Sequence, residues 1–418
     1  MNLTISLPLD IPDVDVLRTK INRAGDVIIT VESTLKGTAC RQCGRKIEKT
    51  HGHDDWIELQ HLPILGRRSY IRLRPKRYRC LSCDNKPTTT QQLNWYQSRC
   101  STTKGYEKHI LLQLVNSTIE DVSHKEAVGY DTIVGIIERC VQKKVNWDEI
   151  ERLEILGIDE IALRKGRKNF VAVITARSAD GRITLLTILP NRKKATVKQF
   201  LRSIPNRLQI TIDTVCTDMW IGYVNAVKEV FDSKVTIVVD RYHVAKSYRE
   251  GVDKFRQRER KRLEKELSEG EYKQLKGVMW PFRKNRRDLE QEEKELLERL
   301  FSYAPLLKSA YELREKLTGI FESFLSQDKA KLEINEWKQE VEKSGLTCFN
   351  KFLTTLDNWF SEILNYFKRR LNSGFVEGFN NKIKVLKQRC YGIFDVSRIF
   401  QRLYLDLEGY RLYAHPYF

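Results

Sequence analysis

The sequence predicts an α/β domain that is interrupted by a long helical segment and preceded by a cysteine-containing module. Between Ile155 and Asp240, short apolar segments typical of strands alternate with amphipathic segments typical of helices. Residues 245–370 are rich in Lys, Arg, Glu and Leu at helical spacing. Two Cys-x-x-Cys pairs stand before residue 100. Together these observations predict a mixed α/β protein of several domains.

The composition limits the class of protein. A chain of 418 residues, 41% of them hydrophobic, is long enough for two or three domains with real cores. Its 74 basic and 55 acidic residues give a net charge of +19, which indicates a polyanionic partner, most often nucleic acid. The sequence has no long apolar run and no signal-peptide pattern. We therefore expect no membrane partner, and nine cysteines that serve as metal ligands and buried thiols rather than disulfides.

Residues 1–100 are predicted to form a zinc-binding, DNA-binding module. The pairs Cys40–Cys43 and Cys80–Cys83 each present two thiolates from a tight turn, and two such turns complete a tetrahedral sulfur shell suited to structural Zn²⁺. The 36 residues between the pairs are more than common zinc fingers have, but alternating segments at 56–62 and 70–74 predict a hairpin that returns the chain. Three histidines, His51, His53 and His61, are further candidate zinc ligands, but we expect them on exposed loops without that role. Cys100 and Cys140 fall outside the paired spacing and are expected to be buried thiols.

The predicted hairpin is strongly basic. Seven Lys or Arg residues lie between Arg67 and Arg79, and strand alternation would place many of them on one face. Such a face is either simply solvated or contacts phosphates. We favour phosphate contact because the local sequence lacks balancing acidic residues. The DNA-binding candidates are Arg67, Arg68, Arg72 and Arg74.

Residues 101–150 have the outline of a helix-turn-helix domain. A cap at 101–104 precedes an apolar stripe at 110–115, and a short second helix is predicted at 118–123. Gly129 would lie in the turn, and Asp131 would cap a third helix that ends at Cys140. Any three helices can imitate this pattern, but its position after a zinc module in a basic chain favours DNA binding.

Residues 151–244 are predicted to form the first part of a catalytic core. Strands at 155–163, 169–175 and 182–189 are followed by a helix at 196–203, a strand at 210–216, a helix after Asp218 and a strand at 235–240. This order, β-β-β-α-β-α-β, is that of an RNase H-like fold. Residues 245–370 would be an all-helical insertion, with Trp280, Trp337 and Trp359 as packing residues.

Residues 371–418 are predicted to complete the core. Glu377 enters a helix, and an amphipathic helix at 395–407 would close the domain. The exposed side of the Glu377 helix is expected to carry Asn380, Asn381 and several cations. The DNA-binding candidates among them are Lys382, Lys384, Lys387 and Arg389.

Three carboxylates occupy similar settings in this core. Asp159 lies in an apolar strand, Asp218 follows the end of a strand, and Glu377 lies in the later helix. A lone buried Asp is most often held by hydrogen bonds, but three together indicate a site for two Mg²⁺ or Mn²⁺ ions about 4 Å apart. One ion would activate an attacking oxygen and the other would stabilise the leaving oxygen at phosphorus. Asp240 also ends a buried strand and is the alternative to Asp218 as the second metal-binding carboxylate. Strand alternation points Glu160 away from Asp159, so we expect a structural role for it.

Four strings around these residues resemble the ISL3-type DDE transposases of bacterial insertion sequences. They are Gly-Ile-Asp159-Glu160, Thr-Asp218-Met-Trp-Ile-Gly-Tyr, Val-Asp240-Arg-Tyr-His243-Val and Val-Glu377-Gly-Phe-Asn-Asn-Lys-Ile-Lys. The resemblance covers nearly the whole chain, including the cysteine pairs. It implies a catalytic triad of Asp159, Asp218 and Glu377, with Asp240 and His243 in a supporting D-x-x-H pattern.

The same resemblance implies an enzyme that acts on double-stranded DNA. It would bind the terminal inverted repeats of an insertion sequence, then cleave and join them to target DNA, as a homodimer in the cytoplasm and nucleoid of a bacterium. Two alternatives remain open at this point. One is a sequence-specific DNA-binding regulator with an inert core, and the other is a structure-selective nuclease or resolvase that uses the same metals.

Overall fold

The structure is a computed structural model that describes residues 8–163, 170–371, 374–390 and 392–414. Three predicted boundary residues, Asn169, Ser373 and Tyr391, lie outside these ranges. The chain divides into two compact units. Unit 1 contains Met1–Lys143, Arg389–Gly392 and Gln401–Phe418, and unit 2 contains Lys144–Gln388 and Ile393–Phe400. Within the described ranges, every helix is too short or too polar to span a bilayer.

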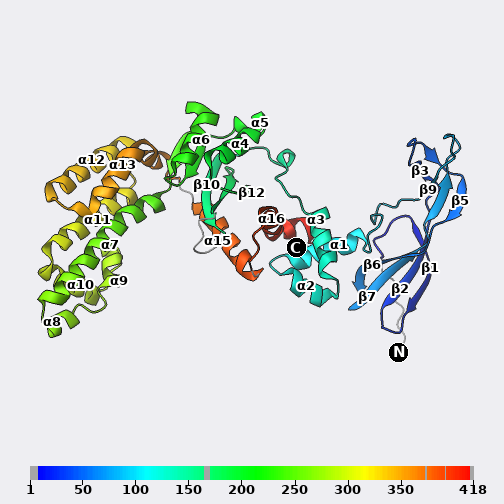
Figure 1. The fold of residues 1–418 in the computed structure, drawn as a ribbon, viewed down its shortest axis with the longest axis horizontal. Coiled ribbons are helices and arrows are strands. Elements are labelled where there is room, and N and C mark those ends of the chain that lie inside the picture. Colours follow the sequence, from blue (N-terminus) through cyan, green and yellow to red (C-terminus); the bar gives the residue numbers. More distant parts are fainter. Residues whose placement is uncertain (1–7, 164–169, 372–373, 391, 415–418) are drawn as a thin grey trace. The chain divides into compact units, whose positions relative to one another are not determined.

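Unit 1 begins with a four-stranded sheet in the order β1-β2-β7-β6 (Figure 1). The strands are β1 (Val14–Ile21), β2 (Val27–Ser33), β6 (Ile57–Ile64) and β7 (Arg67–Leu73). The predicted hairpin is confirmed, because β6 and β7 pair antiparallel with Ile57 opposite Leu73. β2 runs parallel to β7, and the inward residues Val31, Leu59 and Ile71 form the core of the sheet.

Three helices follow where the sequence predicts them. They are α1 (Lys104–Leu114), α2 (Ile119–Glu126) and α3 (Tyr130–Cys140). Thr103 and Thr118 cap the first two through their hydroxyls, as small polar residues do at helix starts. The prediction that Asp131 caps α3 is wrong: Gly129 is the cap, because Ala127 ends α2 in the left-handed conformation only three residues before α3 begins.

The last helix, α16 (Val396–Tyr413), corrects another expectation. We expected it to close the catalytic core, but from Gln401 onward it belongs to unit 1. Leu405 joins the buried core of α1, α2 and α3. The Gln401 amide donates to the carbonyl oxygens of Ile137 and Val141 at 3.2 and 2.7 Å. An apolar stripe predicts that a helix is buried on one face but does not identify its partner.

Unit 2 contains a five-stranded sheet in the order β12-β11-β10-β13-β14. The strands are β10 (Ile155–Ala162), β11 (Phe170–Arg177), β12 (Ile183–Leu189), β13 (Thr214–Thr217) and β14 (Thr236–Val239). β10, β11 and β12 pair antiparallel, whereas β13 and β14 run parallel to β10. The predicted element order is therefore observed. The predicted start of β13 at Ile210 is wrong, because Ile210 is the exposed C-cap of a short helix, α5 (Asn206–Gln209), and the strand begins only at Thr214.

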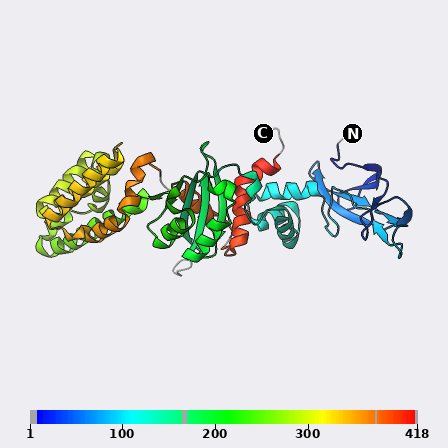
Figure 2. The same cartoon turned by 90° about the horizontal axis from the view of Figure 1, so that it is seen from above.

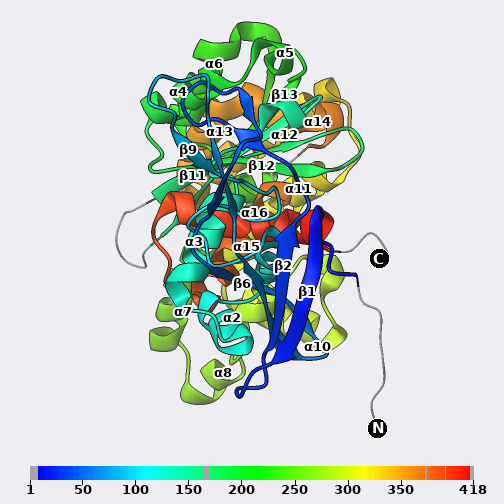
Figure 3. The same ribbon diagram turned by 90° about the vertical axis from the view of Figure 1, so that its right-hand side faces the viewer.

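Helices cover both faces of this sheet. On one face, α4 (Lys194–Ser203) and α6 (Ile221–Phe231) pack on each other and on Leu156 and Val215 (Figure 3). On the other face, the helical insertion packs against Cys216 and Val238. The sheet is consequently buried on both sides, as expected for a strand set that is almost entirely apolar.

The insertion forms a helical bundle from residue 241 to residue 369 (Figure 2). Its longer helices are α7 (Arg241–Glu266), α10 (Gln291–Tyr303), α11 (Pro305–Glu322), α12 (Gln327–Ser344) and α13 (Asn350–Leu364), with α8 (Glu269–Lys273), α9 (Met279–Arg283) and α14 (Tyr366–Arg369) between them. Trp337 is fully buried against Phe349 and Phe352, which confirms it as a packing residue. Trp280 is 64% exposed, so the packing prediction is wrong for that residue.

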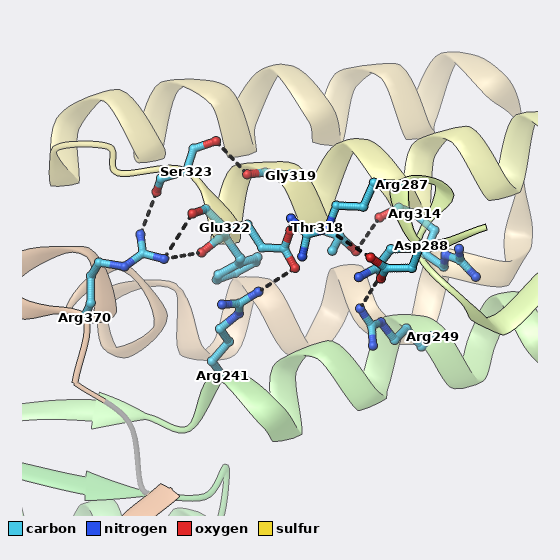
Figure 4. A network of polar contacts seen from close by, with 12 residues as sticks. Arg241, Arg249, Arg287, Asp288, Arg314, Thr318, Gly319, Glu322, Ser323 and Arg370 are labelled. Atoms are coloured by element: carbon cyan, nitrogen blue, oxygen red, sulfur yellow. Dashed lines mark hydrogen bonds and ion pairs between the residues drawn. The ribbon is translucent and has the colours of Figure 1, made fainter. Parts of the chain in front are cut away.

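Both ends of the insertion are fixed to the end of α11 (Figure 4). Arg241, at the entry, approaches the Glu322 carboxylate at 3.4 Å. Arg370, at the exit, donates to the carbonyl oxygens of Phe321 and Ser323 at 3.1 and 2.6 Å. The Arg370 guanidinium thereby satisfies free carbonyl groups of a helix terminus, whereas Arg241 forms an ion pair with the last residue of that helix. The same contacts hold the insertion at the two points where the chain leaves and re-enters the sheet domain.

Candidate functional site

Four cysteines of unit 1 converge on one point. The Sγ atoms of Cys40 and Cys83 lie 4.0 Å apart, those of Cys43 and Cys80 3.8 Å, and those of Cys80 and Cys83 3.6 Å. All four lie within 4.8 Å of one another. A tetrahedral Zn²⁺ with Zn–S bonds of ~2.3 Å requires sulfur–sulfur separations of ~3.8 Å. The arrangement therefore fits a structural zinc ion.

Each cysteine pair is held by a small hairpin. Strands β3 (Thr38–Ala39) and β4 (Lys46–Ile47) flank the first pair, and β8 (Lys76–Arg79) and β9 (Thr88–Thr90) flank the second, with β5 (Thr50–His53) beside β8. Gly44 supplies the left-handed turn after Cys43 at a φ of +69°. The backbone N–H groups of Cys43 and Gln42 lower the pKa of Cys40 to about 6, which favours the thiolate that a metal requires.

The leftover candidates of unit 1 do not extend this site. His61 is buried, not on an exposed loop, and its ring nitrogens lie 2.8 Å from the Thr103 hydroxyl and 3.0 Å from the Leu9 carbonyl oxygen. Cys140 is exposed, so the prediction of a buried thiol is wrong for it, and Cys100 is half-buried. His61 therefore links β6 to the start of α1 through its contact with Thr103.

In unit 2, three aspartates stand in register across neighbouring parallel strands. The last paired residues are Ile158 with Thr217 and Thr217 with Val239. The next residue in each case is an aspartate: Asp159, Asp218 and Asp240. Neighbouring strands are ~4.8 Å apart, so the three acidic residues are brought to one edge of the sheet at roughly that spacing. This edge is the carboxyl end of the parallel strands, where open α/β sheets bind ligands.

The carboxyl of Asp218 is in an unfavourable environment for a lone negative charge. Burial, and after it the nearby charges of Glu160 and Asp159, raise its pKa to about 7. Burial also raises the pKa of Asp159, with His243 acting in the opposite direction. Asp218 Oδ1 is buried and has no hydrogen-bond partner within the described residues. A buried carboxylate oxygen that lacks a donor and is repelled by neighbouring charges, as at Asp218, is suited to a divalent cation.

The helix that carries Glu377, α15 (Gly374–Arg389), lies along β10 on the face of Gly157. A Cβ atom at Gly157 would stand 2.2 Å from the Val376 side chain, so only glycine allows this approach. Two residues further along β10, the Asn380 amide donates to Asp159 Oδ2 at 2.7 Å. Lys387 donates to the Ala162 carbonyl oxygen at 3.1 Å. The helix and the strand thus run side by side over their whole contact.

Glu377 lies one helical turn before Asn380, on the same side of α15. Its side chain is exposed, whereas Asn380 is buried. Among the described residues, the only group of three or more His, Cys, Asp or Glu whose ligand atoms lie within 4.8 Å of one another is the cysteine cluster. Strand register therefore brings Asp159 and Asp218 together, whereas Glu377 lies on the helix that contacts Asp159 through Asn380 and joins no compact carboxylate cluster among the described residues.

Comparison with known proteins identifies the family. Residues 156–403, more than half of the chain, match the ISL3 transposase family. Residues 36–83 match the zinc-finger of the transposases IS204, IS1001, IS1096 and IS1165. The chain belongs to the ISL3 family of DDE transposases. The resemblance inferred from the sequence motifs is confirmed, and the long interval between the cysteine pairs lies within the zinc-finger match.

Individual relatives extend over nearly the whole transposase. It is 26% identical to the transposase for insertion sequence element IS1001 of Bordetella parapertussis, over 91% of each chain. It is 21% identical to the transposase for insertion sequence element IS1557 of Mycobacterium tuberculosis, over 89% of this chain and 86% of that one. Among solved structures, the Drosophila P element transposase strand transfer complex is 12% identical with a TM-score of 0.42, covering 73% of this chain and 92% of that chain.

Asp240 and Glu160 have other partners in the transposase. Asp240 is buried at the start of α7, where its carboxylate accepts from the Tyr242 N–H at 2.9 Å and caps the helix. Glu160 accepts two hydrogen bonds from Arg192, at 3.0 and 2.7 Å. Arg192 in turn stacks over Trp220 at 4.2 Å. Both acidic residues therefore make local contacts, and the roles expected of them stay predictions.

Several basic residues of the predicted DNA-binding surfaces are already paired within the protein, contrary to the prediction. Arg68 pairs with Asp26 at 3.0 Å, and Lys76 pairs with Glu32 at 3.1 Å. The acidic partners that the local sequence lacks are therefore supplied by β2 and its flank. On α15, Lys382 and Lys384 are exposed as expected, but Lys387 is bound to the β10 backbone and Arg389 pairs with Asp406. The prediction of a continuous exposed basic side on α15 is wrong.

Sequence reasoning missed three residues at the sheet edge: Asn380, Arg192 and Tyr223. Asn380 was expected on the exposed side of α15 but contacts Asp159, and its Oδ1 atom is buried without a partner in the described part of the chain. Tyr223 is fully buried, and burial and the Asp218 charge raise the pKa of its phenol. The spacing of Asn380, three residues after Glu377, was the available signal for the first of these.

Proposed function

We propose that this transposase binds the terminal inverted repeats of its insertion sequence and catalyses their metal-dependent cleavage and strand transfer. Asp159, Asp218 and Glu377 are the proposed catalytic triad, on a core of RNase H-like topology. The observation that carries the proposal is the register of Asp159 and Asp218 at the ends of adjacent parallel strands, with the Glu377 helix fixed to Asp159 through Asn380.

The residues present fit divalent cations of the Mg²⁺ type. Asp159, Asp218 and Glu377 would hold two ions, because hard oxygen ligands suit Mg²⁺ and Mn²⁺ and the buried Asp218 Oδ1 lacks a partner among the described residues. When bound, such ions activate the attacking oxygen of water or a DNA 3′-hydroxyl and stabilise the leaving 3′-oxygen.

The chain's own residues prepare this site in three ways. The Asn380 amide holds Asp159 Oδ2 and leaves the other oxygen to accept from the Glu160 N–H at 2.7 Å. Asp240 caps α7 and so places His243 in its first turn, where the His243 ring lowers the pKa of Asp159. Arg192 neutralises Glu160, which otherwise adds to the repulsion on Asp218.

The remaining parts are proposed to bind DNA. Residues 1–100, with the zinc module, and residues 101–150, as a helix-turn-helix domain, would recognise the repeats. Residues 151–244 and 371–418 would form the catalytic core around the insertion at 245–370. Because two ends must be processed together, we infer a homodimer in the DNA complex.

The deciding experiment is cleavage and joining of end-containing oligonucleotides by the purified protein with Mg²⁺ or Mn²⁺. Wild type is compared with Asp159→Asn, Asp218→Asn and Glu377→Gln. Nicking at the repeat end and joining to a second duplex, both lost in each variant, support the proposal. A regulator with an inert core would bind the repeats without nicking them. A resolvase would cut branched DNA without requiring repeats and would join nothing.

A further inference from the structure

A groove of about 580 Å³ lies on the insertion, between α7 on one side and α9 and α11 on the other. The α7 residues that line it recur every three or four positions from Tyr242 to Gln257, so they form one stripe on that helix. Fifteen residues of helix span ~22 Å. The groove is thus long and narrow, and it follows the helix away from its first turn.

The lining of the groove is basic. It includes five cationic side chains, Lys246, Arg249, Lys254, Arg283 and Arg314, and two acidic ones, Glu250 and Asp253. Asp253 is already paired, with Arg283 at 2.7 Å and with Arg256 at 2.9 Å. Glu250 is 3.9 Å from Lys246. Arg314 pairs with Glu315, which is outside the lining, at 2.7 Å. The remaining positive charge is that of Arg249 and Lys254, for which the described residues supply no ion pair.

Two guanidinium groups in the groove have unused donors. The Nε atoms of Arg249 and Arg314 are buried and lack hydrogen-bond partners within the described residues. Arg314 is 3% exposed and extends from α11, while Arg249 extends from α7 (Figure 4). The other donors of Arg314 are bonded to the carbonyl oxygen of Lys284 and to Glu315, whereas Arg249 is partly exposed in the groove. Guanidinium groups bind phosphate oxygens through charge-assisted hydrogen bonds, so Arg249 is the arginine available to an anion there.

The near end of the groove adjoins the proposed catalytic edge. Its first lining residue, Tyr242, donates its backbone N–H to the Asp240 carboxylate at 2.9 Å. The Tyr242 ring is 58% exposed and contacts the His243 ring edge-on at 5.5 Å. An exposed aromatic ring at the mouth of a basic groove is the combination that proteins use to bind a nucleic-acid strand.

We propose that this groove binds the DNA strand that continues past the scissile phosphate, with its phosphates on Lys246, Arg249 and Lys254 and a base stacked on Tyr242. A length of ~22 Å spans about six base-pair steps of B-DNA at an axial rise of ~3.4 Å each. The assignment rests on the proposed function, because it takes the edge beside Asp240 as the place where the strand is cut. It assigns the insertion a direct role in holding substrate.

The test measures binding rather than cleavage. The probes are duplexes of the inverted repeats that border the gene, ending at the cleavage position or extended past it by two, four, six or eight nucleotides. Binding to the full-length protein is followed by fluorescence anisotropy in Ca²⁺ over a range of salt. We expect wild-type affinity to rise with flank length and to level off near six nucleotides.

The variant Lys246→Ala/Lys254→Ala should lower affinity for the long-flank probe roughly tenfold and reduce its salt slope by about 1.4–1.8, with no change for the flush probe. Tyr242→Leu should weaken the same interaction and Tyr242→Phe should restore it. The matched control is Lys261→Ala/Lys265→Ala, which removes two exposed lysines of α7 outside the groove.

Two results would overturn the assignment: equal loss of affinity in the control, or an affinity that is independent of flank length. Failure of the proposed function would look different. If Asp159→Asn cleaved normally, the triad would be refuted while flank-dependent binding could persist. If flank dependence were absent while cleavage required the triad, only the groove assignment would fall.

Discussion

The cysteine site and the carboxylate site are positioned by different kinds of structure. In the cysteine site all four sulfur atoms lie within 4.8 Å, at the separations that a tetrahedral metal requires. In the carboxylate site Asp159 and Asp218 are aligned by strand register, and Glu377 is supplied by a helix that contacts Asp159 through Asn380. The first site is set by two hairpins of a few residues. The second depends on positions 159, 218 and 377, which are joined through a sheet, a helical bundle and a returning helix.

The difference has a physical basis in charge as well as in distance. Thiols are neutral when protonated, so four cysteines can approach one another closely in a half-buried cluster. Carboxylates repel one another, and the raised pKa of Asp218 expresses that repulsion together with burial. The cysteine site should therefore be a determinant of folding, and the carboxylate site a determinant of catalysis.

The largest effect is expected from Asp159→Asn. Removing one charge at the aligned edge should lower cleavage at least about 10³-fold, the scale on which loss of a single charge-stabilising group acts. Binding to the repeats should be unchanged, because the DNA-binding modules lie elsewhere in the chain. Cleavage assays and anisotropy on the same preparation measure the two properties. Normal cleavage by this variant would refute the triad.

Cys80→Ser should have the opposite pattern. Loss of one of four thiolates weakens zinc binding, and the module should unfold locally because metal binding is coupled to folding. Repeat binding should fall by about 10²-fold or more, and zinc content should fall by about one ion per chain. Cys100→Ser is the matched control, since Cys100 is half-buried and outside the cluster. Retained zinc and retained binding in Cys80→Ser would contradict the assignment.

The same contrast explains what the sequence could predict. The cysteine pairs, the β6–β7 hairpin and the order of strands follow from local spacing and alternation, and all are observed. The positions of Asp159 and Asp218 at strand ends are local properties as well. Where a residue's environment comes from a distant segment, prediction failed. Asn380 and Lys387 were predicted to be exposed, because no local feature of the sequence shows that α15 lies against β10.

The basic hairpin and the last helix failed for the same reason. Arg68 and Lys76 were judged unpaired from their neighbours in sequence, but Asp26 and Glu32 reach them from β2 and its flank. The apolar stripe of α16 was assigned to the nearest domain, whereas Leu405 packs with α1 and α3. Gly157 was a usable signal, since a glycine within a buried strand marks a close approach of another element.

Asn380→Ala tests the contact that brings the Glu377 helix to Asp159. A hydrogen bond to a charged group contributes ~1.5–3 kcal/mol, so cleavage should fall roughly 10- to 100-fold if the bond persists in the transition state. The Mn²⁺ concentration for half-maximal activity should rise, which a merely structural loss would not produce. Asn381→Ala is the control, because the neighbouring side chain is exposed and contacts only Lys384 among the contacts described.

The smallest effect concerns pH and metal affinity. Because the pKa of Asp218 is raised to about 7 in the metal-free fold, its carboxyl carries a proton below that pH and must release it when a divalent cation binds. Affinity for Mn²⁺ should therefore rise up to tenfold per pH unit as pH approaches about 7, and should level off above it.

The sign for stability is opposite to that of a paired carboxylate. A folded-state pKa above the unfolded value means that the folded chain binds the extra proton between about pH 4 and 7, so this carboxyl destabilises the metal-free fold increasingly as pH rises through that interval. Mn²⁺ should remove the effect. Calorimetric titration with Mn²⁺ in two buffers of different ionisation enthalpy measures the released proton directly. Asp218→Asn should abolish that release, and a proton count of zero for the wild type at pH 6 would show that burial and repulsion do not act on Asp218 as inferred.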